Sequence, residues 1–381
     1  MKNQSTYPIT LPGCTQSELK DYLQSIGEKP FRSRQIMEWL YGKCQFDVEK
    51  MSNLSAALRE KLSADSACPR SQVVESVPGS GGTTKLLIKL ADEEIIEMVL
   101  IPSPERMTFC LSTQVGCPVR CRFCASGADG LIRNLTYDEI LEEFYHGVMM
   151  HGSIPDNIVF MGIGEGLLNW KNLQRALDIL TLPVPDGFGM SPRRITVSTS
   201  GYLAGMREFA AWERPFNLAV SLHAVDDETR ARLIPDHCRY PVQDILQECR
   251  NYTEKSGRMV TFEYTLIAGI NDDPAMGRKL GMIARDLHAK VNLIACNPVN
   301  SDFARPGDRQ LKMFQKAVEE NATTVTMRIE KGSSAASACW NSPVVSATVV
   351  AVFHSSVLKL SALILPNMRW ATGSRTSVAS R

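Results

Sequence analysis

The sequence lacks the segments that direct a chain into or through a membrane. Residues Met1–Thr10 are polar and no apolar run follows them, so the pattern of a secretory signal is absent. The nearest approach to a long apolar run, Pro343–Pro366, is interrupted by His354, Lys359 and several serines, which argues against a membrane-spanning helix. We therefore expect a cytoplasmic protein without a membrane partner.

The chain also lacks an excess of charge of either sign. Its 42 Lys and Arg residues almost balance its 41 Asp and Glu residues, so the formal net charge is +1. Attraction of nucleic acid by a globally basic surface is thereby excluded, and an RNA partner would need a local basic patch. No Asp or Glu follows Glu330. The acid-free tail, residues 342–381, reads either as disordered or as a stretch whose reading frame has drifted.

The composition is that of a globular protein, and the chain is long enough for more than one domain. Apolar residues make up 44% and charged residues 22% of the 381 positions. Residues 15–62 read as helical, because Ile36, Trp39 and Leu40 recur at helical spacing. We take residues 1–66 as an N-terminal helical domain. Its scattered basic residues fit RNA docking, although a purely structural role explains the composition about as well.

The rest of the chain reads as strands followed by helices. Thr84–Leu90 and Glu94–Ile101 predict a β-hairpin within a linker, residues 67–103. Further strands are predicted at Met107–Ser112, Asn157–Met161, Arg194–Thr199, Phe216–Leu222, Met259–Leu266, Val291–Cys296 and Thr324–Ile329. Helices are predicted at Tyr137–Met150, Trp170–Leu180, Pro241–Thr253 and Met276–His288. Repeated βα units over residues 104–341 predict a partial or full barrel, with its site at the carboxyl ends of the strands.

One group of cysteines stands apart from the other cysteines of the chain. Cys117, Cys121 and Cys124 have the spacing C-x3-C-x2-C. Most of the other cysteines are expected to be small buried residues of the core, without a chemical role. Three thiolates on a loop after a strand can hold three irons of a [4Fe–4S] cube and leave the fourth open. An open iron can chelate S-adenosylmethionine and cleave it reductively to a 5′-deoxyadenosyl radical. Zinc usually takes four protein ligands with paired spacings, and no second C-x-x-C occurs, so iron is favoured over zinc or chance.

Polar and glycine residues follow the predicted strands and can contact S-adenosylmethionine. Gly164 lies in a glycine-rich turn where backbone can approach a ligand closely, and Glu165 can accept from an ammonium group. Other candidates at strand ends are Ser198, Ser221, His223 and Asn297. Each alone is more often an ordinary turn residue. Their common position at strand ends is what favours a binding site.

Taken together, these motifs resemble the radical-SAM RNA adenine methyltransferases. That family includes an adenine-C2 methyltransferase of 23S rRNA and tRNA and a C8-methylating relative. The resemblance covers about Thr15 to Cys339 and rests on Phe31–Tyr41, Cys110–Cys117, the cluster cysteines, Gly162–Glu165, Val197–Gly201, Ser221–Ala224, Glu263-Tyr264, Asn271-Asp272 and Asn297-Pro298. It implies a partial (β/α) barrel of radical-SAM type with a small N-terminal helical domain. It also implies rRNA and tRNA partners and an electron donor such as flavodoxin, and we expect a monomer.

The resemblance further implies a mechanism that uses two molecules of S-adenosylmethionine. The first methylates a cysteine, which by position is Cys339. The second yields the radical that takes hydrogen from this methyl group, and the resulting carbon radical adds to adenine C2. Glu97 matches the carboxylate that takes the ring proton. The alternative is that Glu97 is an outward-facing strand residue without a catalytic role. Cys110 matches the second cysteine, which releases the methylated RNA by forming a disulfide bond.

Two departures from the family pattern keep alternatives open. The family has Gly-Glu-Pro where this chain has Gly164-Glu-Gly166, and the string around Cys339 lacks the family's acidic neighbour and following glycine. The first hypothesis is an adenine-C2 methyltransferase acting on the peptidyl transferase centre and on the tRNA adenosine next to the anticodon. The second is a C8-specific enzyme. The third is a cluster-bearing RNA-binding protein that transfers no methyl group.

Overall fold

The computed structural model describes residues 8–66, 68–297, 302–322 and 324–328, which belong to one compact unit. The α-helices are α1 Gln16–Ser25, α2 Arg32–Met37, α3 Ala56–Asp65, α4 Tyr137–His151, α5 Trp170–Thr181, α6 Leu203–Ala211, α7 Asp227–Leu233, α8 Val242–Ser256, α9 Pro274–Asp286 and α10 Asp308–Glu319. The strands are β1 Gln72–Pro78, β2 Thr84–Lys89, β3 Ile95–Ser103, β4 Arg106–Cys110, β5 Gln114–Gly116, β6 Leu131–Asn134, β7 Asn157–Phe160, β8 Ile195–Thr199, β9 Asn217–Ser221, β10 Thr261–Leu266, β11 Lys290–Ala295 and β12 Val325–Arg328.

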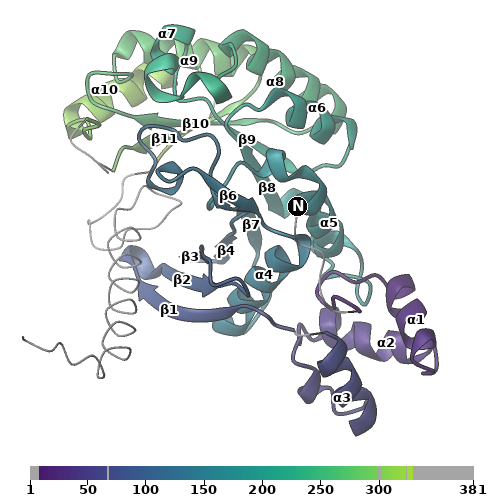
Figure 1. Cartoon of the computed structure of the whole chain (residues 1–381). Coiled ribbons are helices and arrows are strands. Elements are labelled where there is room, and N and C mark those ends of the chain that lie inside the picture. Colours follow the sequence, from purple (N-terminus) through teal and green to yellow (C-terminus); the bar gives the residue numbers. More distant parts are fainter. Residues whose placement is uncertain (1–7, 67, 298–301, 323, 329–381) are drawn as a thin grey trace, which may run out of the picture. The chain divides into compact units, whose positions relative to one another are not determined.

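Ten of these strands form one sheet (Figure 1). Its order is β1-β2-β3-β4-β7-β8-β9-β10-β11-β12, and every pair from β4 to β12 is parallel. The predicted strand–helix alternation and parallel sheet are therefore confirmed. In the described part of the chain β1 and β12 are the edge strands, so the sheet is open, as the partial barrel requires.

The predicted hairpin is also confirmed, and it belongs to the main sheet. Strands β2 and β3 pair antiparallel with Leu87 opposite Glu97, and β3 pairs antiparallel with β4. The additional strand β1 extends this antiparallel edge beyond β2. A separate two-stranded sheet of β5 and β6 brackets the segment that carries the three clustered cysteines.

The ends of α4 follow from local sequence. At the amino end the Glu139 carboxylate accepts from the Thr136 N–H at 2.9 Å, and Gly152 ends the helix in the left-handed conformation (φ 87°). Arg133, on β6, bonds Glu139 through Nη1 at 2.8 Å and Asp92 through Nε at 2.6 Å. The helix after the cysteine loop is thus tied to the turn between β2 and β3.

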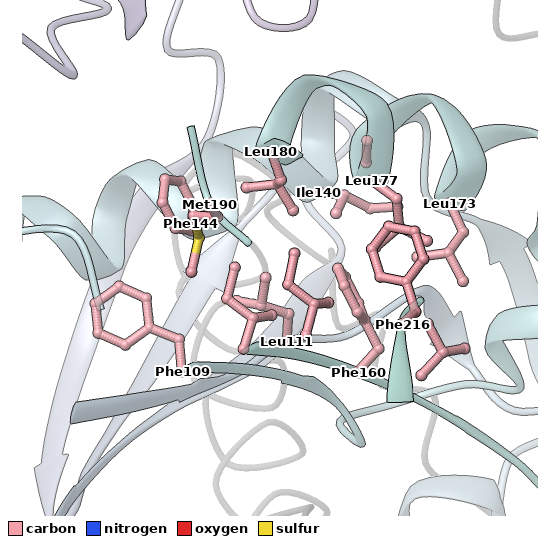
Figure 2. Close-up of a cluster of buried hydrophobic side chains, with 14 of the residues drawn as sticks. Phe109, Leu111, Ile140, Phe144, Phe160, Leu173, Leu177, Leu180, Met190 and Phe216 are labelled. Carbon is pink, nitrogen blue, oxygen red and sulfur yellow. The ribbon is translucent and has the colours of Figure 1, made fainter. Parts of the chain in front are cut away.

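Alternation along β4 separates the core from the opposite face of the sheet. Phe109 and Leu111 are fully buried and point toward α4 and α5, where they meet the apolar side chains drawn in Figure 2. Successive strand residues face opposite sides, so Thr108 and Cys110 point away from these helices. Burial on one face therefore determines which side chains are left for the other face.

The N-terminal segment is helical, as predicted, and packs on the sheet domain through specific contacts. Tyr41 lies edge-to-face on Phe188, with ring centroids 5.1 Å apart, and its hydroxyl donates to the Cys14 carbonyl at 2.9 Å. Arg175 of α5 donates to a carboxylate oxygen of Glu18 at 2.7 Å. Because Glu18 also closes the capping box of α1 with Thr15, one carboxylate stabilises both the helix and its attachment.

We expect Glu18→Gln to lower the free energy of unfolding by about 0.5–1 kcal/mol at neutral pH, because the amide keeps the cap but loses the charge. Burial alone would raise the pKa of Glu18, but bonds from Thr15 and Arg175 hold it below its ordinary value of 4.5. A lowered pKa means that this stabilisation is complete above the ordinary value and is lost as the pH falls through the lowered one. Urea unfolding at pH 7 and pH 3 measures the difference.

Glu28→Gln is the matched control for this test, since Glu28 forms no ion pair within 4.0 Å in the described segments. An equal loss of stability in both variants, or a loss that persists unchanged at pH 3, would contradict the assignment.

Candidate active site

A cavity of about 480 Å³ lies against the face of the sheet opposite the α4–α5 core. It is bounded by β3 and β4, by the cysteine loop and by the carboxyl ends of the parallel strands, where a barrel of this class is expected to hold its site. The predicted site residues that line it are Cys110, Cys117, Cys121, Cys124, Gly164, Glu165, Ser198, Ser221 and His223. The structure thus brings together groups that lie more than 100 residues apart in the sequence.

Three predicted residues are not among those that line the cavity. Asn297 follows the end of β11 but is not part of the cavity wall. Glu97 lies on the face of β3 that carries the lining residues Val99 and Ile101, but it is 2% exposed and its carboxylate is 3.2 Å from the Lys85 ammonium. The outward-facing reading of Glu97 is therefore wrong. Cys339 lies outside the described residues.

The cysteine loop is held by backbone hydrogen bonds from both sides. The Cys117 N–H donates to the Gly130 carbonyl at 2.9 Å, and the Arg122 N–H donates to the Leu233 carbonyl at 3.0 Å. Gly116, just before the loop, has φ 72°, and a Cβ there would collide with the Gly130 carbonyl. The loop therefore starts from a turn that only glycine accommodates without strain.

The surroundings of the three thiols fit an iron–sulfur cube. In the described part of the chain no three His, Cys, Asp or Glu side chains are placed to hold one metal ion. A cube does not require this, because each thiolate ligates a different iron. Cys117 and Cys121 pack against an apolar cluster that contains Val119, Phe123 and Ile267. Such walls exclude water from a cluster and so influence its reduction potential.

Burial opposes ionisation of these thiols when no metal is bound. It raises the pKa of Cys117 to about 12 and the pKa values of Cys121 and Cys124 above the ordinary 9.0. Metal binding requires the thiolate form, so iron would have to displace these protons. Soft thiolate donors beside an apolar surface that excludes water are the ligands that an iron–sulfur cluster prefers.

The glycine-rich turn after β7 places a buried carboxylate against the cavity. Glu165 accepts from the Ser200 N–H at 2.6 Å and from the Ser200 hydroxyl at 2.8 Å. Burial raises its pKa, while these bonds act in the opposite direction. Gly164 has φ 115°, and a Cβ there would lie 2.7 Å from side-chain atoms of Gln114 and Thr113. The absence of a side chain at Gly164 therefore lets the turn pack closely against Gln114 and Thr113, as well as against a ligand in the cavity.

His223 is a neutral hydrogen-bond donor at the end of β9. Its Nδ1 accepts from the Thr265 N–H at 3.1 Å, so the ring proton belongs on Nε2. Burial lowers the pKa of His223 to about 3, and the charge of Arg230 acts in the same direction. Asn271 donates to the His223 carbonyl at 2.8 Å, which supports its unusual φ of 55°. The ring also packs edge-to-face on Phe123 of the cysteine loop, with ring centroids 5.0 Å apart.

Sequence patterns did not single out Arg230, Thr108 or Lys85 as residues of this region. Arg230 lies in α7, a helix that the sequence analysis did not delimit, and it is fully buried beside the strand ends. Thr108 lies two positions before a predicted site residue, Cys110, and lines the same cavity. The sequence alone does not show which face of the sheet a residue of this strand occupies. Only the register of β2 against β3 brings Lys85 near Glu97.

Comparison with known proteins first defines the class. Residues 111–277 match the model of the radical SAM superfamily, and residues 9–68 match that of the ribosomal RNA large subunit methyltransferase N-terminal domain. A solved radical SAM methyltransferase from Sphaerobacter thermophilus is 37% identical and covers 88% of this chain and 99% of its own, with a TM-score of 0.81. The fold and site are therefore those of a radical SAM methyltransferase, whose cofactors are a [4Fe–4S] cluster and S-adenosylmethionine.

Comparison with curated sequences then gives the family. A "probable dual-specificity RNA methyltransferase RlmN" of Lachnoclostridium phytofermentans is 39% identical over 336 residues, which are 88% of this chain and 94% of the relative. The protein of the same description from Moorella thermoacetica is 40% identical over 344 residues, 88% of this chain and 97% of the relative. The chain belongs to this family of dual-specificity radical SAM RNA methyltransferases. Among the residues that the structure describes, no helix is long and apolar enough to cross a membrane.

Proposed function

We propose that this enzyme methylates C2 of an adenine in 23S rRNA and in tRNA, and that it uses two molecules of S-adenosylmethionine and a methyl-cysteine. The observation that carries this proposal is one cavity lined by Cys110, by the three clustered cysteines and by Glu165. Cys110 lies on the cavity wall outside the three-cysteine motif, and the second-cysteine role that the family resemblance implies is consistent with this position.

In this proposal Cys117, Cys121 and Cys124 hold the cluster. When bound, the cluster supplies an electron, from a donor such as flavodoxin, that cleaves S-adenosylmethionine to the radical required for hydrogen abstraction. Glu165 accepts from the ammonium group of S-adenosylmethionine. The Nε2–H of His223 and the hydroxyls of Ser198 and Ser221 serve as donors to its oxygens, and Gly164 completes this wall of the binding surface. Asn297, just after β11, is included on the ground of the family motif and not of the cavity wall.

Cys339 carries the methyl group and Cys110 releases the product. The Cys339 thiolate first takes the methyl group as the sulfonium C–S bond of S-adenosylmethionine breaks. After hydrogen abstraction the methylene carbon bonds to adenine C2, and Glu97 takes the ring proton. The Cys110 thiolate then attacks the Cys339 sulfur, forming an S–S bond as the S–C bond breaks. The electron pair of that bond and a proton complete the new methyl group, and the unpaired electron leaves through the disulfide.

Lys85 holds the Glu97 side chain in place for this step. The two side chains form a buried ion pair, 5% and 1% exposed. Removal of one partner from such a pair leaves a buried charge without compensation, which is costly. The proposal therefore treats Lys85 as the residue that positions the Glu97 carboxylate.

The N-terminal helical domain, residues 1–66, is proposed to dock the RNA. Its match to the methyltransferase N-terminal domain supports this role, and so does the surface around α2. Phe31 is 56% exposed and carries the guanidinium of Arg32 at 5.0 Å from its ring centroid. Exposed aromatic rings beside cationic groups bind unpaired bases by stacking and phosphates by charge.

We expect Glu165→Gln to weaken binding of S-adenosylmethionine by roughly 10- to 100-fold, because a hydrogen bond to a charged group is replaced by one to a neutral amide. Isothermal titration of the cluster-loaded protein measures this affinity. Glu208→Gln, an exposed change on α6, is the control. Unchanged affinity in the Glu165 variant would remove this residue from the binding site.

The proposed function is tested by reconstituting the protein anaerobically with iron and sulfide and supplying a 23S rRNA fragment or tRNA. Mass mapping of the digested RNA should find a methyl group on adenine C2. A methyl group on C8 would identify the other regiochemistry of the family. Absence of methylated RNA from a fully loaded protein would contradict both.

A second candidate function rests on the departures around Cys339. The string there lacks the acidic residue and the glycine of the family pattern. A protein in which this segment no longer delivers its thiol would bind RNA and hold a cluster without transferring methyl groups. Cluster absorbance and cleavage of S-adenosylmethionine without RNA methylation would identify that case.

A further inference from the structure

Arg230 is a buried cation without a paired anion in the part of the chain that the structure describes. Its side chain is fully buried at 0% exposure, and it forms no ion pair within 4.0 Å. Arginine is almost never fully buried without a partner, because removing a charge from water is costly. The position therefore calls for a negative charge that no carboxylate of the described residues supplies within 4.0 Å.

The hydrogen bonds of Arg230 are with neutral backbone carbonyls at the ends of two strands. Nη1 donates to the Ser221 and Leu222 carbonyls, and Nη2 donates to the Ser200 carbonyl. Nε is buried without a hydrogen-bond partner. These carbonyls orient the guanidinium and tie the ends of β8 and β9 together, but they leave its charge uncompensated.

The negative charge that this position faces is that of the cysteine loop. Ser200 and Ser221, whose carbonyls accept from Arg230, line the same cavity as Cys121. Burial has the larger effect on the pKa of Cys121 and raises it, while the charge of Arg230 acts to lower it, in agreement with this position. Burial lowers the pKa of Arg230 to about 10, so the group is still a cation at neutral pH. Asp227 and Arg239 act on it with opposite signs, and neither forms an ion pair with it.

We propose that Arg230 is a positioning residue that compensates the negative charge of the thiolate-ligated cluster and thereby raises its reduction potential. Each reduction adds an electron to a group that already carries three thiolates, and a nearby buried cation stabilises the added charge strongly where water is excluded. This inference rests on the proposed function only in that the three cysteines hold a cluster. It does not depend on methyl transfer or on the RNA.

The test compares Arg230→Met, which removes the charge, with Arg230→Lys, which keeps it. The readout is the midpoint potential of the reconstituted cluster, obtained from a mediator-controlled redox titration followed by electron paramagnetic resonance without RNA. We expect reduction of the Met variant to be at least tenfold less favourable, which is about 59 mV for a one-electron couple. The Lys variant should stay close to the unmodified protein.

Arg258→Met is the matched control. Arg258 also has a buried Nε without a partner, but it bonds Asn217 at the amino end of β9, the end away from the cysteine loop. Its replacement should leave the potential unchanged.

Each outcome decides the inference. A Met variant with the potential of the unmodified protein overturns it, as does an equal shift in the Met and Lys variants. If the Met variant holds no cluster but the Lys variant is fully loaded, the charge is needed even for assembly, which supports the inference. If neither variant holds a cluster, the hydrogen bonds matter and the charge does not, and the inference fails. Failure of the unmodified protein to load iron would contradict the proposed function instead.

Discussion

Replacing Cys339 with alanine is expected to abolish methylated RNA while iron content and cluster absorbance stay unchanged. The reason is chemical: adenine C2 carries no acidic proton and is electrophilic, so a methyl group cannot reach it by simple displacement. Without the Cys339 sulfur there is no methyl group from which hydrogen can be taken. Product formation should fall below detection in a mass assay of digested RNA.

Two further variants make this expectation specific. Cys249→Ala removes a buried thiol of α8 that does not line the cavity and should leave methyl transfer intact. Cys110→Ala should leave RNA covalently attached to the protein, since no thiol remains to attack the Cys339 sulfur, and denaturing electrophoresis would show the adduct. Full activity of the Cys339 variant would rule out the two-cysteine mechanism in this enzyme.

The second large effect is expected at the cluster. Cys121→Ala leaves two of three thiolates, and the protein should lose most of its iron together with all reductive cleavage of S-adenosylmethionine. Cys296→Ala is the matched control, because Cys296 is a fully buried thiol in the apolar cluster that packs against the same loop. If the Cys121 variant kept a full complement of iron, another residue would have to be the ligand.

Much of this architecture was predictable because its signals are local. The strands from Asn157 to Ala295 are rich in buried apolar residues, and the helices between them carry one apolar side. The cysteine spacing and the glycine turn at Gly164 are equally local patterns. Their meeting in one cavity followed from a general property of parallel sheets, whose carboxyl ends lie at one edge.

What could not be predicted depends on register and on contacts between distant segments. Glu97 belongs to a buried pair only because β2 places Lys85 diagonally across from it. Arg230 looks like an ordinary helical arginine until its helix is folded over the ends of β8 and β9. Asn297 follows the end of β11, and its contact with S-adenosylmethionine stays a prediction, because the position of the strand end alone does not test it.

Metal and sulfide analysis of anaerobically purified protein tests the central claim most directly. Three thiolates that hold a cube predict about four iron and four sulfide ions per chain, with an electron paramagnetic resonance signal on reduction that changes when S-adenosylmethionine is added. Zinc in place of iron, or protein without metal after reconstitution with iron and sulfide, would contradict the account.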